Sequence, residues 1–192
     1  MIKCNVTVCG VIGRDASIRT NKEGKTFLVF PLRVMIPDTD GKTMPIEVDV
    51  SKDTAGKEVS KYRNGSRIEV SGTMYLKHRG DKLYFNLFIN EIRTATADAK
   101  DTVKGELVFR GKVGQHIEEK RDKKDQPYTM FSAFSTEKVE DGFEYQWVRF
   151  FCFGKEREAW LQPGVRVDAK GEISLSAYNG MFHARWKNLY SM

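Results

Sequence analysis

The stretch QWVRFFCFGKE, residues 146–156, carries the side chains of this chain with the most distinctive chemistry. If it is an extended strand, Trp147, Arg149, Phe151 and Phe153 share one face, because successive side chains of a strand point to opposite sides. The residues between them are apolar and can face a core. Aromatic rings beside a guanidinium group can stack planar groups and attract anions. The other interpretation is a second buried face that a partner covers.

The sequence holds no catalytic or metal-binding set that spacing identifies. The three histidines are isolated from one another and from any Cys pair at metal-ligand spacing. The three cysteines are odd in number and lie inside strand-like runs, which favours buried thiols in a reducing compartment. Carboxylates are not clustered beside a loop arginine, as a nuclease would require. We therefore expect no enzyme activity, no cofactor and no metal.

Length and composition favour a globular protein with one medium or two small domains. The 192 residues are 40% hydrophobic and 11% aromatic, with a formal net charge of +6. This charge favours a polyanionic partner only weakly, because solvated lysines alone can produce it. Nothing resembles a signal peptide or an apolar run of ~18 residues, so we expect a cytoplasmic protein without membrane contact.

The chain contains two copies of one pattern, separated by about 100 residues. CNVTVCGVIG at 4–13 recurs as GELVFRGKVG at 105–114, and NGSRIEVSG at 64–72 recurs as PGVRVDAKG at 163–171. The segment at 94–104 between the copies lacks large apolar residues and is typical of a linker.

Each copy is predicted to form five short strands, with one brief helix between the third and the fourth. This is the order of an OB-fold, a five-stranded Greek-key barrel. The expected fold is all-β, with an OB-fold barrel in residues 1–93, a linker in 94–104 and a second OB-fold barrel in 105–192. The expected strands are 3–12, 25–36, 44–51, 66–77, 82–92, 105–114, 127–137, 144–153, 165–176 and 181–190, and the expected helices are 55–62 and 155–161.

Residues 1–95 contain five more Lys and Arg than Asp and Glu, whereas residues 96–192 contain one more. Aromatic and basic side chains on the expected strands and hairpins of the first copy are therefore candidates for contact with an anionic partner. A solvated, charged hairpin explains the charged members of this set equally well. These candidates are Arg14, Arg19, Lys22, Lys25, Phe27, Arg33, Tyr75, Lys77, Arg79, Lys82 and Tyr84, and we add Tyr128, with which the repeat aligns Phe27.

The segment NVTVCGVIGRDASIRTNKEGKTFLVFPLRV resembles the opening of bacterial single-stranded DNA-binding proteins. The matching positions include Gly10, Asp15, Arg19 and Phe30. WVRFFCFGKEREAWLQPGVRVDAKGEI resembles the second half of the same family. The resemblance implies OB-fold domains that assemble as four barrels, which a chain with two tandem domains reaches as a homodimer. It also implies a place at the nucleoid.

Carried onto this sequence, the family's stacking positions fall on Trp147 and Phe153, and its basic contact falls on Arg149. The resemblance thus implies binding of single-stranded DNA with little sequence preference, in replication, repair or recombination. RNA in place of DNA stays open. The chain ends at NLYSM, so we expect no acidic recruiting tail of the kind that the family carries. The alternative function is an OB-fold assembly module of replication restart or of a mobile element.

The third strand of the first copy lacks the aromatic stripe. In MPIEVDVSKD, Ile46, Val48 and Val50 must face the core, because the opposite register would bury Glu47 and Asp49 without partners. The outer face then carries two carboxylates, which would repel phosphates. We therefore predict that the second copy provides the stacking platform.

Overall fold

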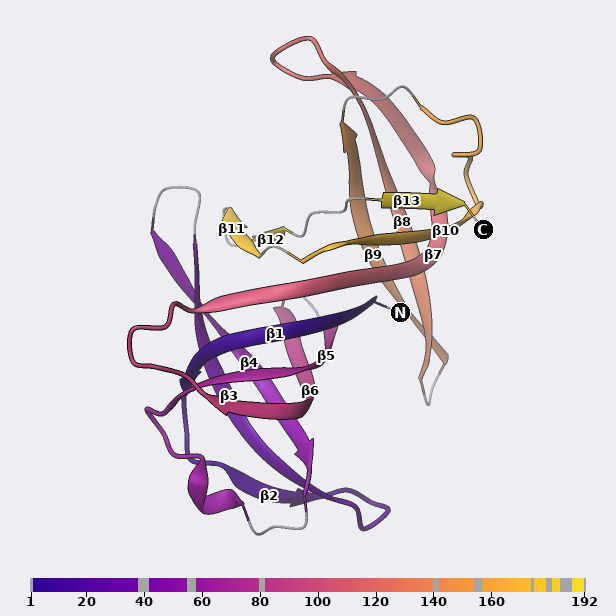
Figure 1. Ribbon diagram of the computed structural model, residues 1–192. Coiled ribbons are helices and arrows are strands. Elements are labelled where there is room, and N and C mark those ends of the chain that lie inside the picture. Colours follow the sequence, from indigo (N-terminus) through magenta and orange to yellow (C-terminus); the bar gives the residue numbers. More distant parts are fainter. Residues whose placement is uncertain are drawn as a thin grey trace. The chain divides into compact units, whose positions relative to one another are not determined.

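The computed structural model describes residues 2–37, 42–54, 58–79, 82–139, 142–153, 157–173, 175–178, 181–183 and 188–191 (Figure 1). These residues form β-strands with almost no helix, which confirms the all-β class. The described chain separates into two compact units. One unit contains β1 to β6 with β11 and β12, and the other contains β8, β9, β10 and β13 with most of β7.

The first half closes into a five-stranded barrel, here called the first barrel. β1 pairs with β3 and β5, β3 with β4, and β5 with β6, all antiparallel. A parallel pairing of β4 with β6 completes the ring, and this order is consistent with the predicted OB-fold. β2 extends the sheet beside β3. The strands are β1 (Ile2–Ile12), β2 (Ser17–Thr20), β3 (Thr26–Pro37), β4 (Thr43–Asp53), β5 (Arg67–Arg79) and β6 (Lys82–Thr94).

Side-chain alternation decides which residues fill the first barrel. Ile46, Val48 and Val50 of β4 are buried, as the sequence predicts, and they lie among alternate apolar residues of β1, β3, β5 and β6. β5 carries a bulge at Gly72, where a side chain would collide with the backbone of Phe88. Bulges increase strand twist and bending, which helps a sheet to close on itself.

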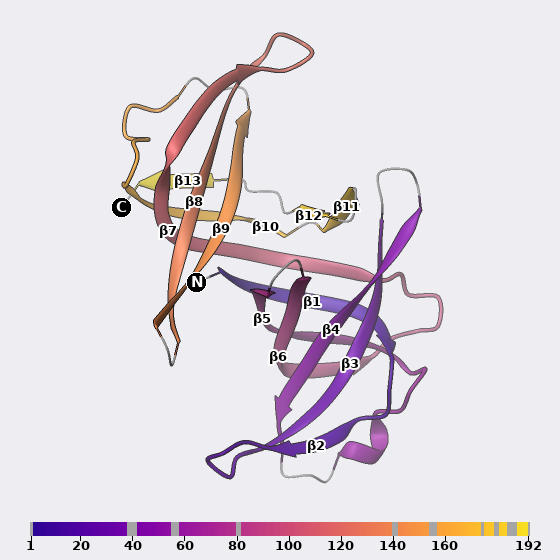
Figure 2. The ribbon, with the colours of Figure 1, turned by 180° about the vertical axis from the view of Figure 1, so that it is seen from behind.

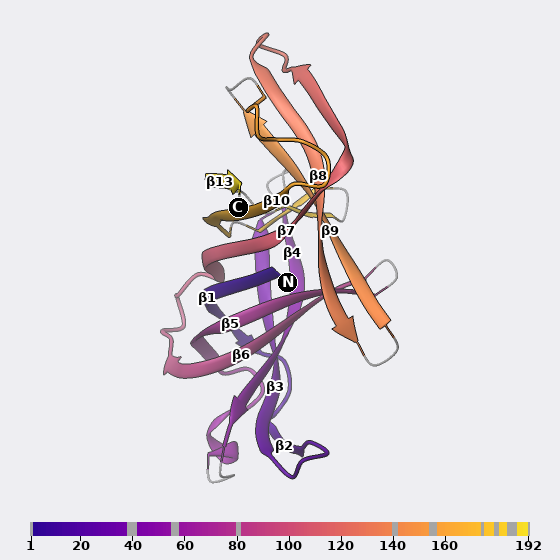
Figure 3. The same cartoon turned by 90° about the vertical axis from the view of Figure 1, so that its right-hand side faces the viewer.

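The second half forms a sheet in the order β13-β10-β7-β8-β9, here called the second sheet. Its long strands run beside one another in Figures 2 and 3. Phe131 stacks on Phe150 with ring centroids 5.0 Å apart, and Phe109 meets Phe150 at 5.2 Å, so these three rings pack together in its core. The strands are β7 (Thr102–Arg121), β8 (Pro127–Val139), β9 (Gly142–Phe153), β10 (Arg166–Glu172) and β13 (Asn188–Ser191).

The end of the second half differs from the sequence prediction. Of the expected strand at 181–190, the structure describes β12 (Met181–His183) and β13, whereas residues 184–187 lie outside the described residues. β11 (Ser176–Tyr178) pairs with β12 in a separate two-stranded sheet. Strand β10 ends at Glu172 instead of continuing to residue 176. The symmetry of the two copies in sequence is therefore not matched by equal strand pairing among the described residues.

The two predicted helices are not confirmed at their expected lengths. The first is a 3-10 helix of three residues, η1 (Val59–Lys61), and the described part of the second, 157–161, is a turn. Short helices nucleate poorly, and the Arg157 side chain donates to the Leu161 carbonyl at 3.0 Å, which satisfies a backbone group without a helix. Residues 55–57 and 155–156 lie outside the described residues.

Candidate nucleic-acid interface

Strand β9 presents an exposed aromatic surface. Trp147, Phe151 and Phe153 are 60%, 46% and 65% exposed, and Arg149 lies exposed among them. Phe150, between them in sequence, is 2% exposed and packs in the core. The alternation of a strand therefore separates the two faces as the sequence predicts. Trp147, Arg149, Phe151 and Phe153 are part of the surface that we call the aromatic face.

Strand β8 adds further rings to the aromatic face because it pairs with β9 along its whole length. Tyr128 lies opposite Phe153, with ring centroids 5.3 Å apart. Phe134 lies opposite Trp147, with centroids 4.9 Å apart. The sequence prediction included Tyr128 and missed Phe134, because only the register between the two strands shows that Phe134 meets the tryptophan.

Two more aromatic residues extend the face toward the start of β9. Phe143 and Tyr145 are exposed and continue the alternation that contains Trp147. The Tyr145 ring lies 5.7 Å from that of Phe134. The sequence prediction missed both, although the same period of two, followed upstream through GFEYQW, could have found them. The complete aromatic face consists of Tyr128, Phe134, Phe143, Tyr145, Trp147, Arg149, Phe151 and Phe153.

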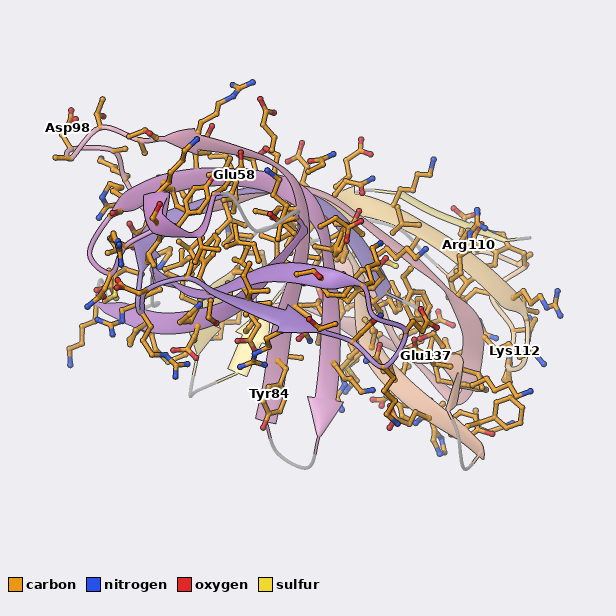
Figure 4. The ribbon with its side chains drawn as sticks, turned by 90° about the horizontal axis from the view of Figure 1, so that it is seen from below. Glu58, Tyr84, Asp98, Arg110, Lys112 and Glu137 are labelled. Carbon is orange, nitrogen blue, oxygen red and sulfur yellow. The ribbon has the colours of Figure 1, made fainter. Side chains whose placement is uncertain are left out.

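The aromatic face carries more positive than negative charge. Arg149 lies opposite Ser132 in the β8–β9 register. On β7, Lys120 lies opposite Tyr128 and pairs with Glu118 at 2.6 Å. The side-chain hydrogen bond with Lys120 lowers the pKa of Glu118, and the same bond raises the pKa of Lys120, so both groups stay charged at neutral pH. Lys112, on the same strand and labelled in Figure 4, lies opposite Phe134.

The charged side chains of the hairpin between β7 and β8 form hydrogen bonds and an ion pair within the hairpin. The Asp122 carboxylate accepts hydrogen bonds from the backbone N–H groups of Lys124 and Gln126 at 2.8 and 2.9 Å. Arg121 pairs with Asp125 at 3.2 Å. These local pairs fit a solvated hairpin tip.

The candidates in the first half lie on the outer surface of the first barrel. Lys77 lies opposite Tyr84 between β5 and β6, and Tyr84 projects from its ribbon in Figure 4. The Lys3 ammonium lies 5.9 Å above the Tyr75 ring. Phe27 meets Phe88 edge to face at 6.5 Å. The side chain of Arg79 lies outside the described residues.

The outer face of β4 is acidic, as the sequence predicts. Glu47 and Asp49 are exposed, and Arg33 of β3 lies opposite Glu47. In the second sheet, the cross-strand pair that corresponds to Arg33 and Glu47 is Phe134 and Trp147. The two halves thus share one strand pairing and present opposite chemistry on it.

The described residues show neither a metal site nor a membrane-spanning helix. In the described ranges, His, Cys, Asp and Glu form no group of three or more that could hold a metal ion. The same ranges contain no helix with the length and hydropathy of a membrane span.

Comparisons with known proteins identify the fold. No protein-family model matches the chain, and no curated protein matches it in sequence. The single-stranded DNA-binding protein from Thermus aquaticus is similar in structure, with a TM-score of 0.53 at 12% identity, over 100% of this chain and 93% of that chain. A deletion mutant of that protein gives a TM-score of 0.50 at 13% identity, over 100% and 94%.

The N-terminal domain of PriB protein from Thermoanaerobacter tencongensis matches 48% of this chain and 97% of its own, at 16% identity. Its TM-score of 0.31 is too low to indicate a shared fold. At these identities the likeness to the Thermus protein concerns the fold alone, which is consistent with OB-fold architecture.

Proposed function

We propose that this protein binds single-stranded DNA with little sequence preference, without catalysis, through the aromatic face of the second sheet. The exposed rings around Arg149 are the observation that carries the proposal. Every base has a π face, so exposed rings beside a cation hold an unpaired strand without reading its sequence. Duplex DNA hides these faces, so it should bind much more weakly.

The rest of the proposal follows the resemblance in sequence and the likeness in fold. The two halves act as tandem OB-fold domains, residues 1–93 and 105–192, joined by residues 94–104. Two chains form a homodimer with four such domains, which protects single strands in replication, repair or recombination. The similar Thermus protein is described as a single-stranded DNA-binding protein, which supports the choice of ligand.

Titration with oligonucleotides tests the proposal. The purified protein is mixed with oligo-dT, oligo-rU and duplex DNA at two salt concentrations, and binding is followed by fluorescence anisotropy of a labelled strand. We expect a strong preference for the single strands and an affinity that falls with salt, with a log-log slope of about −0.7 per phosphate neutralised. Equal affinity for duplex DNA would exclude the stacking mechanism.

Substitution of Arg149 separates charge from stacking. Arg149→Gln should weaken oligo-dT binding and make the salt dependence less steep by about one neutralised phosphate. Arg149→Lys keeps the charge, so its salt dependence should match that of the unaltered protein while the loss of a planar cation weakens binding. An unchanged salt slope in Arg149→Gln would show that Arg149 does not contact phosphate.

The second candidate function is an assembly module whose barrel faces bind other proteins. The exposed carboxylates of Glu47 and Asp49 favour it, because they would repel a DNA backbone on that face. A protein that fails to bind any single strand, and whose aromatic face becomes protected from hydrogen exchange in a protein complex, would support this candidate instead.

A further inference from the structure

A cavity of about 350 Å³ opens on the outer face of the first barrel, on the side of β2, β3 and β4. This volume lies at the lower end of the range for small-ligand sites. Its floor is apolar and its walls are polar, with both signs of charge. Its lining includes Arg14, Arg19, Val29, Asp49, Ser51 and Asn86.

The cavity exists because small side chains replace large ones in the first barrel. In the β3–β4 pairing, Val29 lies opposite Ser51 and Pro31 lies opposite Asp49. The matching pairs in the second sheet are Met130 with Phe151 and Ser132 with Arg149. Ser51 therefore occupies the position of an exposed phenylalanine, and the space that the ring would fill is open.

The strand register places hydrogen-bonding groups on one side of the cavity floor and cationic groups on the other. Asn86 of β6 lies directly beside Asp49, so an amide and a carboxylate share one wall. Ser17 and Arg19 of β2 lie opposite Val29 and Phe27, on the other side of β3. Arg14 lines the cavity from the segment before β2. A planar ligand on Val29 would thus meet hydrogen-bonding groups at one edge and cations at the other.

The segment that carries Arg14 is fixed to the barrel. The Gly13 N–H donates to the Pro31 carbonyl and the Ala16 N–H to the Tyr62 carbonyl, both at 2.9 Å. Asp15 accepts from the Asn64 N–H at 2.7 Å and from Arg63 at 3.1 Å. These hydrogen bonds, the one from Asn64 above all, lower the pKa of Asp15 and keep it charged. The wall of the cavity is therefore pre-organised.

Among the described residues, the charged side chains that line the cavity, other than Asp15, are not paired with one another. Within the part of the chain that the structure describes, no hydrogen bond or ion pair involves the side chains of Arg14, Arg19 or Asp49. They can accordingly engage a ligand without first breaking a protein contact.

We propose that this cavity binds one guanine nucleotide. Guanine presents two adjacent N–H donors on its Watson–Crick edge, and a carboxylate such as Asp49 accepts two parallel hydrogen bonds. Adenine and cytosine offer one amino donor beside a ring acceptor, and uracil or thymine places carbonyl acceptors on both sides of its N–H. The base lies on Val29, beside the small side chain of Ser51, and its phosphate faces Arg14 and Arg19.

Calorimetric titration of the whole protein with GMP, AMP, CMP and UMP tests the pocket. We expect GMP to bind about tenfold more tightly than the other three, as one bidentate contact typically provides. A second arm compares oligo-dT with oligo-dT that contains one dG, which shows whether the guanine can be part of a strand. Equal affinity for all four nucleotides, or no binding of GMP, would overturn the proposal.

Asp49→Asn is the decisive variant, with Glu47→Gln as its matched control. Both remove one exposed carboxylate from the same strand face, but Glu47 does not line the cavity. Asp49→Asn should abolish the preference for GMP, whereas Glu47→Gln should keep it. If both variants instead bind all nucleotides more tightly and to the same extent, Asp49 only repels phosphate and the pocket is not a guanine site.

Two further variants test the volume and the phosphate contact. Ser51→Phe, which copies the second sheet, should fill the cavity and abolish GMP binding while the urea midpoint stays unchanged. Arg19→Gln should weaken GMP and leave guanosine unaffected. An unchanged GMP affinity in Ser51→Phe would place the nucleotide elsewhere.

The guanine pocket goes beyond the proposed function and does not depend on it. Trp147→Ala should leave the preference for GMP intact, since the tryptophan belongs to the aromatic face. Loss of GMP binding with retained oligo-dT binding would overturn only the pocket, and the reverse result would overturn only the proposed function.

Discussion

At the scale of single residues, we predict that Trp147 of the aromatic face contributes directly to oligo-dT binding. All three tryptophans lie at or beyond residue 147, so intrinsic fluorescence reports on the second half. Oligo-dT should quench this fluorescence. Trp147→Ala should remove much of the quenching and weaken binding by ~1–3 kcal/mol, because one stacked base is lost. Titration of the two proteins under identical salt measures the difference.

Met35→Ala is the matched control for this substitution. Met35 is 37% exposed on the first barrel, so its truncation also removes exposed apolar surface. It should leave oligo-dT affinity unchanged. An equal loss in both variants would show that the aromatic rings have no special role.

Cys4 gives a prediction about pH. Its side chain is fully buried, and this desolvation raises the pKa of the thiol from 9.0 to about 12. In the unfolded chain the thiol ionises near pH 9, whereas in the folded protein it stays neutral, so stability should fall as pH rises from about 9 toward 12. Urea unfolding at pH 8 and pH 10 measures this fall, and Cys4→Ala should show a smaller one. A pH dependence identical in both proteins would contradict the assignment to Cys4.

At the scale of elements, strand β9 has one face that packs in the core and one face that is exposed. Phe150 packs between Phe109 and Phe131, whereas Phe151, its neighbour in sequence, is exposed. Phe150→Ala should lower the free energy of unfolding by ~3–5 kcal/mol, because it leaves a cavity. Phe151→Ala should lower it by less than about 1 kcal/mol and weaken oligo-dT binding. Urea unfolding and strand titration together test the pair, and similar unfolding midpoints would contradict the division.

At the scale of the whole molecule, the proposed homodimer has a direct test. Light scattering at micromolar concentration should return twice the 22.0 kDa of one chain. The expectation comes from the resemblance to proteins that assemble four OB-fold domains. A mass of one chain, with oligo-dT binding retained, would mean that two domains suffice for the function.

The sequence by itself determined the face of each residue within a strand. Trp147, Arg149 and Phe153 lie exposed in β9, and Val48 lies buried in β4, as the alternation predicts. This succeeds because the direction of a side chain depends on the local backbone alone. The all-β class follows from the same local signals, namely short apolar runs bounded by turn residues.

Only the tertiary structure decided what lies beside those residues. Phe134 joins Trp147, and Asn86 joins Asp49, through strand registers that link residues far apart in the chain. The separate β11–β12 sheet likewise breaks the symmetry that the repeat predicts, and so does the turn in the described part of the second expected helix, residues 157–161. Register and pairing depend on how whole strands pack around a core, so a pattern confined to one strand cannot specify them.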